Sequence, residues 1–417
     1  MYEEVFGLNF WNRYFQVLMR VITRTIFILS LISLFADVAS EMIYPVIPLF
    51  LKDIGFSVVW IGLLEGLANF TAGISKGYFG KLSDEKGVRL PFIRIGYLLS
   101  AISKPMMGLL TAKLWIFFAR TVDRLGKGVR TAARDALLSQ QTIKENKGKV
   151  FGFHRSMDTL GAAIGPVIAL VFLLFNPGEY RTLFFIAFIP GVISILLIFL
   201  LKEKKQPVST LGKGGFFSFF KYWKIATPEF KKLVKGLLLF AFFNSSDVFL
   251  LLKTKEAIGD QTINILGVSF NDETITIAAY IFYNLVFAIA AYPMGVMADK
   301  FGMKKTFMLG LLLFSVVYLS FAFTPSILFI FILFLIYGLY AAATEGIAKA
   351  WITNTAHETN TATAVGFYTS CESICAFSAS VIAGAVWAGF GSAVTFIATG
   401  LISLVVLFYF LLKFRKI

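Results

Sequence analysis

Long apolar runs recur along the chain from about Ile22 to Leu412, separated by short polar stretches. A run of about 18 or more apolar residues is what an α-helix needs to cross the hydrocarbon core of a bilayer. We place such runs at 22–50, 58–80, 92–111, 113–138, 149–176 and 180–201, and then at 231–257, 273–298, 304–323, 326–350, 359–388 and 392–412. No strand-like alternation competes with them. The pattern predicts an all-α membrane protein of about 12 transmembrane helices.

A polar and basic stretch divides these runs into two sets of six. We predict an N-terminal six-helix bundle over 1–202, a cytoplasmic linker over 203–230 and a C-terminal six-helix bundle over 231–417. The end of the linker, Phe216 to Lys224, mixes aromatic and basic residues. This segment suits the membrane surface, and an ordinary solvated loop is an equal alternative.

The composition agrees with a bilayer as solvent, since 58% of residues are hydrophobic and only 15% are charged. A net charge of +15 would suggest nucleic acid in a soluble protein, so the position of the basic residues decides. Between the apolar runs we count about 25 Lys and Arg on one side and about 5 on the other. This bias predicts an inner-membrane protein with both termini in the cytoplasm and no nucleic-acid partner.

The sequence lacks the residue arrangements that disulfide bonding, metal-dependent catalysis or ATP-driven pumping would need. The two cysteines, Cys371 and Cys375, stand four apart on one predicted helix, where a disulfide is geometrically poor. The chain has only two histidines and no H-E-x-x-H pattern, which gives little support to a metalloenzyme. It also has no G-x-x-x-x-G-K-S/T loop, which argues against an ATP-driven pump. We therefore expect no cofactor, no metal and no enzymatic activity, and an ion gradient as the energy source.

The two halves match each other at a shift of 214 to 215 residues. Gly80, Asp84, Gly87 and Arg89 recur as Gly295, Asp299, Gly302 and Lys304. The same shift relates Asn69 to Asn284, Arg130 to Glu345, Arg134 to Lys349, Gly152 to Gly366, Ser156 to Ser370 and Asp158 to Glu372. A parallel repeat of six spans predicts a functional site between the two bundles near mid-membrane.

The loop G-x-L-S-D-E-x-G-x-R at 80–89, with its second copy at 295–305, resembles the signature loop of the major facilitator superfamily. The resemblance covers nearly the whole chain. It implies a monomeric secondary transporter of two pseudo-symmetric six-helix bundles, in which these two loops gate the transport path. Asp84 and Asp299 are then expected to accept hydrogen bonds or to meet the N-terminus of a neighbouring helix.

Two further motifs resemble branches of that superfamily. Gly161, Gly165 and Pro166 on the fifth span are similar to the antiporter motif of drug:proton exporters, G-x-x-x-G-P-x-x-G-G, although Ala169 and Leu170 replace its last two glycines. The combination D-R-x-G-K-G-x-R-T on the fourth span and T-E-G on the tenth resembles a subgroup of prokaryotic permeases. The first similarity implies export in exchange for protons. By composition alone, such a small-residue face is ordinary helix packing.

Ionisable groups inside a span are costly unless they face a wet cavity or a partner, so each is a candidate for function. As proton-coupling candidates we select the carboxylates Asp37, Glu41, Asp158, Asp247 and Glu372. As substrate-cavity candidates we select Asn69, Lys104, Arg124, Lys127, Arg155, Asn284 and Glu345. We interpret Arg130 and Arg134, near the cytoplasmic end, as structural. Glu345 and Lys349 can pair within one helix, whereas Glu372 has no partner in its own.

Two functions follow from this set. The first is proton-coupled antiport, meaning efflux, of a small amphipathic organic compound by alternating access, with the basic residues neutralising the carboxylates. The alternative is proton-coupled uptake of an anionic metabolite or a metal-chelate. It is favoured if Lys104, Arg124 and Lys127 face the cavity without partners. In either case the partners are a small-molecule substrate, protons and the lipid bilayer.

Overall fold

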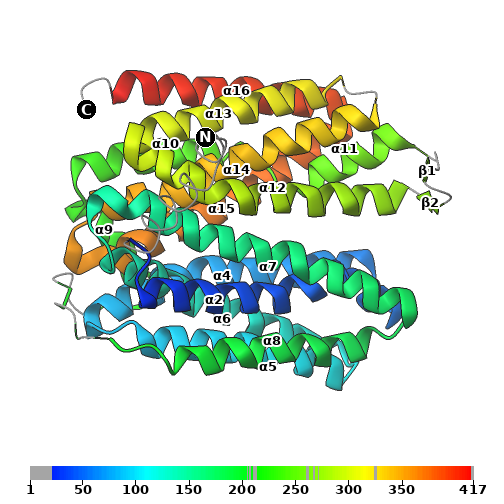
Figure 1. The fold of residues 1–417 in the computed structure, drawn as a ribbon, viewed down its shortest axis with the longest axis horizontal. Helices are drawn as coiled ribbons and strands as arrows, with labels where there is room; N and C mark the ends of the chain where they lie inside the picture. The colour runs from blue at the N-terminus through cyan, green and yellow to red at the C-terminus, as the bar shows by residue number, and fades with distance from the viewer. Residues whose placement is uncertain are drawn as a thin grey trace, which may run out of the picture.

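The computed structural model describes residues 21–203, 205, 208–209, 214–259, 263–265, 268–270, 272–323 and 326–414. Its long helices run roughly parallel in two packed groups (Figure 1). The first group contains α2 (Arg24–Ile43), α3 (Ile47–Asp53), α4 (Val58–Lys86), α5 (Leu90–Leu109), α6 (Lys113–Gln140), α7 (Lys147–Phe175) and α8 (Tyr180–Ile198). The short 3-10 helix η1 (Lys144–Asn146) precedes α7.

The second group lies beside the first and follows the linker helices η2 (Phe216–Lys221) and α9 (Tyr222–Ile225) (Figure 1). It contains α10 (Pro228–Ala241), α11 (Val248–Ile258), α12 (Asp272–Phe301), α13 (Met303–Phe321), α14 (Ile327–Thr355), η3 (Glu358–Asn360), α15 (Thr361–Phe390) and α16 (Ser392–Lys413). The strands β1 (Ile263–Ile265) and β2 (Val268–Phe270) form a small antiparallel hairpin between α11 and α12. The all-α fold class is confirmed, and this hairpin is an element that the hydrophobic pattern did not predict.

Local sequence sets several helix ends. Thr23 and Ser57 accept hydrogen bonds from the backbone N–H groups of Ile26 and Trp60 at the starts of α2 and α4. Gly87 ends α4 with a φ of 62°, a left-handed conformation that glycine adopts without a steric penalty. In the described part of the chain, eight helical segments are long and apolar enough to cross a membrane.

Two predicted spans are not continuous helices. The first breaks after Ile43, where Pro45 precedes the start of α3. The seventh, predicted over 231–257, breaks between α10 and α11, and residues 242–247 are not helical. This second break leaves Asp247 at the N-terminus of α11, outside any regular helix. The prediction of one unbroken seventh helix is therefore wrong.

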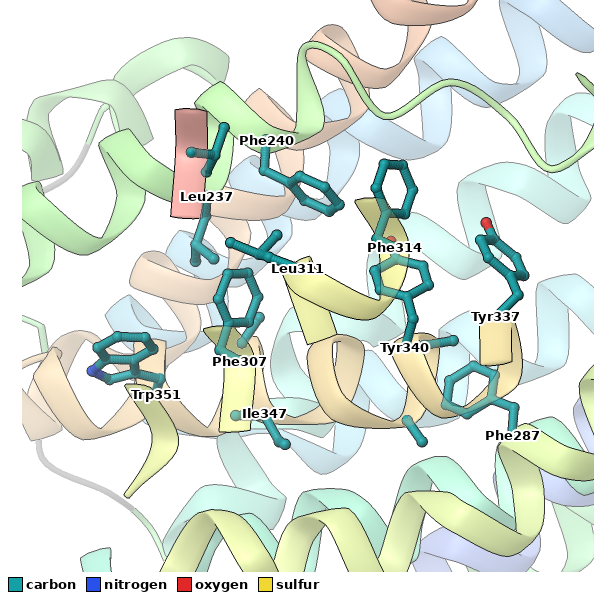
Figure 2. Close-up of a cluster of buried hydrophobic side chains, with 14 of the residues drawn as sticks. Leu237, Phe240, Phe287, Phe307, Leu311, Phe314, Tyr337, Tyr340, Ile347 and Trp351 are labelled. Atoms are coloured by element: carbon teal, nitrogen blue, oxygen red, sulfur yellow. The ribbon is translucent and has the colours of Figure 1, made fainter. Parts of the chain in front are cut away.

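The core of the second group is rich in aromatic rings. Phe307, Phe314, Tyr337 and Tyr340 pack with Leu237, Phe240, Phe287, Leu311, Ile347 and Trp351 (Figure 2). The rings of Phe314 and Tyr340 lie 4.8 Å apart at their centroids. Aromatic pairs at such distances stabilise a core beyond the area they bury. This cluster packs α10, α12, α13 and α14 of the second group against one another.

The aromatic part of the linker packs on the helices and is not a free loop in solvent. Phe219 and Tyr222 are fully buried. Phe219 packs against α4 so closely that a Cβ added to Gly77 would lie 2.5 Å from its ring. The ring of Trp223 stacks on Phe367 of α15, with centroids 5.7 Å apart. The alternative of an ordinary solvated loop is wrong, because the segment is docked on helices of both groups. The exposed rings of Phe216 and Phe217 leave the location at the membrane surface as a prediction.

Candidate substrate cavity and the contacts that close it

A cavity of about 520 Å³ lies between the two helix groups. Helices α2, α4, α6 and α7 line it from the first group, and α10, α12, α13, α14 and α15 line it from the second. Nine of the twelve candidate residues face it, namely Asp37, Glu41, Lys127, Arg155, Asp158, Asp247, Asn284, Glu345 and Glu372. The repeat predicts a site between the two bundles, and this cavity lies where the two helix groups meet.

The other three candidates lie elsewhere. Lys104 is buried, and its Nζ lies 2.5 Å from Oδ1 of Asp123 and 3.1 Å from Oγ of Ser40. Arg124 Nε lies 3.7 Å from the other oxygen of Asp123. Asn69 is exposed on α4 and does not line the cavity, although its repeat partner Asn284 does. A buried carboxylate that pairs with basic groups on two helices is a structural feature, so Lys104 and Arg124 do not belong to the cavity.

A chain of alternating charges, whose two ends lie four residues apart on α14, joins the two helix groups beside the cavity. Arg155 of α7 pairs with Asp158 on its own helix and with Glu345 of α14. Arg134 of α6 continues the ring, with Nη1 3.8 Å from Asp158 and Nη2 3.0 Å from Asp135. Lys349 of α14 is the other end, with Nζ 3.0 Å from Asp135, so the chain of charges begins and ends on the same helix. We call these six residues the charge ring.

The charge ring corrects two predictions. Glu345 and Lys349 do not pair with each other, because each has a partner across the cavity on the first helix group. Arg134 was predicted to have a structural role only. It does form ion pairs, but it also lines the cavity. Ion pairs that cross between two bodies must break when those bodies separate. The ring therefore couples the position of α14 to that of α6 and α7.

Asp37 and Glu41 stand apart from this ring. The carboxyl of Asp37 faces that of Asp158 and the ammonium group of Lys127. Within the described residues, neither Asp37 nor Glu41 forms an ion pair with a basic side chain. The antiporter-like glycines explain their placement. A Cβ added to Gly161 would lie 2.4 Å from the carbonyl oxygen of Leu34, and one added to Gly165 would lie 2.6 Å from the backbone nitrogen of Met42. The small-residue face of α7 therefore packs directly on the segment of α2 that carries both carboxylates.

The second helix group contributes carboxylates held by tyrosines. Tyr337 donates a hydrogen bond of 2.6 Å to Asp247, and the Tyr283 hydroxyl lies 3.4 Å from its other oxygen. Tyr368 donates a bond of 2.6 Å to Glu372. The expectation that Glu372 lacks a partner in its own helix is therefore wrong, since Tyr368 precedes it by one turn of α15.

Sequence reasoning missed two kinds of lining residue. Lys76 of α4 lines the cavity opposite Glu372, with Nζ 3.5 Å from Oγ of Ser373. Its charge inside an apolar run was the signal that could have found it. Tyr280, Tyr283, Tyr340 and Tyr368 also line the cavity. No sequence signal separates them from the many aromatic residues that face lipid.

The two glycine-containing loops make equivalent contacts between the helix groups. Asp84, at the end of α4, accepts hydrogen bonds of 2.6 Å from the backbone N–H and the hydroxyl of Thr363, at the start of α15. Asp299, at the end of α12, accepts bonds of 2.8 and 2.9 Å from the N–H groups of Gly148 and Lys149, at the start of α7. A carboxylate is stabilised at a helix N-terminus by free N–H groups and the helix dipole. The expected partner of each aspartate is confirmed.

Glycines allow the backbones to approach along both interfaces. A Cβ on Gly152 of α7 would lie 2.6 Å from the carbonyl oxygen of Ala291 on α12. A Cβ on Gly366 of α15 would lie 2.4 Å from the carbonyl oxygen of Lys76 on α4. These two glycines are related by the repeat, as are Ser156 and Ser370, which bond to backbone carbonyls of Ala288 and Gly73. The two halves thus meet through duplicated contacts at the α7–α12 and α4–α15 interfaces.

Comparison with known families identifies this architecture. The family model described as Major Facilitator Superfamily matches residues 29–270 and 262–416. The chain belongs to this superfamily. An uncharacterised MFS-type transporter of Methanocaldococcus jannaschii is 31% identical over 370 residues, which cover 88% of this chain and 89% of that protein.

More distant superfamily members agree in part of the sequence or in fold. The multidrug resistance protein MdtG of Citrobacter koseri is 28% identical over 179 residues, covering 41% of this chain and 43% of MdtG. The solved structure of the fucose:proton symporter FucP of E. coli superposes with a TM-score of 0.74 at 13% identity, covering 94% of this chain and 98% of FucP. The chain is thus an integral membrane transporter of the major facilitator fold.

Proposed function

We propose that this transporter exports a small amphipathic organic compound in exchange for protons, by alternating access. The observation that carries the proposal is the pair of carboxylates Asp37 and Glu41, which line the cavity without an ion pair among the described residues. A carboxyl that faces a wet cavity can take up a proton in one orientation and release it in the other. MdtG, which is similar to part of this chain, is named for multidrug resistance, and this similarity supports export.

The alternating movement is proposed to involve two bodies, 1–202 and 231–417, joined by the linker 203–230. In this proposal the contacts of Asp84 and Asp299 close the cytoplasmic side. The basic loops beside them support cytoplasmic termini in an inner-membrane protein. The charge ring and both aspartate contacts would then break as the cavity opens to the cytoplasm. A single chain holds the whole cavity, so we propose a monomer.

Uptake of an anionic metabolite or a metal-chelate is the second candidate. It is favoured if Lys104, Arg124 and Lys127 face the cavity without partners, but Lys104 and Arg124 pair with Asp123 outside the cavity. Lys127 and Lys76 remain in the cavity as basic groups without an ion pair in the described part of the chain. They face Asp37 and Glu372, respectively, so the basic charge is balanced by nearby carboxylates. This balance favours the first candidate.

Proton movement in inverted vesicles tests the proposal. A proton gradient is imposed, and lipophilic cations, neutral drugs and organic anions are added in turn. We expect a compound to dissipate the gradient with the natural chain and not with Asp37→Asn, which removes the charge at unchanged size. Asp53→Asn, at the exposed end of α3, is the matched control and should behave as the natural chain. The proposal fails if no compound moves protons while organic anions accumulate in right-side-out vesicles.

A further inference from the structure

Asp247 occupies an unusual place in the cavity wall. It stands where the seventh span is interrupted, directly before α11, and its side chain makes no capping bond to that helix. Interrupted helices at membrane depth are tolerated only where they are buried in protein or line a cavity, and in transporters they often form binding sites. Asp247 does line the cavity. The break therefore presents a carboxylate to the transport path.

Tyrosines surround this carboxylate and fix its position. Tyr337 and Tyr283 contact one carboxylate oxygen each, at 2.6 and 3.4 Å. Their rings lie 5.1 Å apart, and the ring of Tyr340 lies 5.1 Å from that of Tyr337. Asn244, also in the break, donates a bond of 3.1 Å to the Tyr340 hydroxyl. The result is a carboxylate among electron-rich ring faces, with its orientation set by hydroxyl groups.

No basic side chain of the described residues forms an ion pair with Asp247. This separates it from Asp123, Asp135 and Asp158, each of which has at least one arginine or lysine partner. The nearby Arg155 is already engaged by Asp158 and Glu345. A carboxylate at membrane depth without a protein cation is stabilised when a cation from outside the protein binds to it.

We propose, resting on the transport function above, that Asp247 with Tyr280, Tyr283 and Tyr340 binds an organic ammonium group of the transported compound. Aromatic rings around a carboxylate attract such a group through the ring quadrupole as well as through charge. The same wall already shows this interaction, because the guanidinium of Arg155 lies 5.3 Å from the ring centre of Phe287.

An inorganic cation fits this place less well. Calcium and magnesium take several oxygen ligands, whereas the tyrosine hydroxyls here direct their hydrogen atoms toward Asp247. Among the described residues no group of three or more His, Cys, Asp or Glu is arranged to hold a metal ion. The neighbouring wall, which includes Leu237, Phe240 and Phe307, is apolar and can contact the hydrocarbon part of an amine (Figure 2). The ligand class is therefore an amphipathic amine or quaternary ammonium compound.

Equilibrium binding to the purified full-length chain tests this site without any gradient. The probe is radiolabelled benzyltrimethylammonium, whose charge is permanent and which carries no exchangeable proton. We expect Asp247→Asn to weaken binding by at least about tenfold, and Tyr283→Phe by a smaller factor. Asp247→Glu should retain part of the affinity, which shows that the charge and not the fold is at issue. Benzenesulfonate, of similar size and opposite charge, should not compete.

Glu256→Gln is the matched control, since Glu256 lies on the same short helix α11, is half exposed and does not line the cavity. It should bind the probe as the natural chain does. The inference is overturned if the natural chain does not bind the probe, or if Asp247→Asn binds it with unchanged affinity. Proton flux on the same samples separates the two proposals. Loss of binding in Asp247→Asn without any proton movement in the natural chain would leave the ammonium site standing and remove proton coupling.

Discussion

The interface between α4 and α15 and the interface between α7 and α12 are related by the internal repeat, yet they are not equally reinforced. Asp84 is fully buried and pairs with Arg89, in addition to its bonds to Thr363. Asp299 is half-buried and accepts two backbone bonds, and in the described residues it forms no ion pair. Lys304, which the repeat aligns with Arg89, donates instead to the carbonyl oxygen of Phe414, 2.7 Å away.

The linker adds to this difference, because its described residues cover the α4–α15 interface and not the other one. The N–H of Ser209 donates a bond of 3.1 Å to the carbonyl oxygen of Asp84, and its hydroxyl bonds to Asn360. Phe219 fills the space above Gly77. The α7–α12 interface has no such cover among the described residues and lies next to the charge ring instead. The repeat therefore duplicates the backbone contacts of the two interfaces, while the ion pairs and the linker decide how stable each interface is.

The largest loss of stability is expected for Asp84→Asn. Removing one partner of a buried ion pair leaves Arg89 uncompensated and costs about 3 kcal/mol or more. We expect a marked fall in the melting temperature of the detergent-purified chain. The comparison variant is Asp299→Asn, and the asymmetry described above is refuted if that variant lowers the melting temperature as much.

An intermediate effect on stability is expected for Phe219→Ala, which removes a fully buried ring from the linker. The cost is about 3 kcal/mol, and it is smaller if the linker collapses onto α4 to fill the space. Maleimide labelling from the cytoplasmic side measures the opening, with Ser370→Cys reporting on one interface and Ser156→Cys on the other. Both are made in a background where Cys371 and Cys375 are replaced by serine.

For Phe219→Ala we expect faster labelling at position 370 and unchanged labelling at 156. Phe217→Ala is the control, since Phe217 is on the same linker and 61% exposed. Equal acceleration at both positions would show that the linker does not act on the α4–α15 interface alone.

The smallest effect is expected for Asp299→Asn. It weakens two hydrogen bonds at the N-terminus of α7 and leaves no buried cation behind, so the cost is about 1 kcal/mol. Labelling at position 156 should become faster while labelling at 370 stays unchanged. A larger response at 370 than at 156 would contradict the assignment of Asp299 to the α7–α12 interface.

Much of the candidate site could be predicted because charge inside an apolar run is rare and easily recognised. Asp37, Glu41, Asp247 and Glu372 were found in this way, and all of them line the cavity. Lys104 was selected by the same rule and does not, because a charge in a span can equally well be satisfied by a partner, here Asp123. The position of a charged residue in the sequence does not show whether it faces the cavity or pairs with another residue inside the helix bundle.

The sequence by itself determined the membrane class, the approximate positions of most spans, the internal repeat and the two aspartates that meet helix N-termini. These features depend on local hydrophobicity and on a repeat that can be read along the chain. Only the tertiary structure decided which charges pair. Arg155 meets Glu345 across 190 positions, and the break before α11 turns Asp247 toward tyrosines of α12 and α14. Such contacts arise from how helices pack against each other, and helix packing brings together residues whose spacing in the sequence carries no trace of the contact.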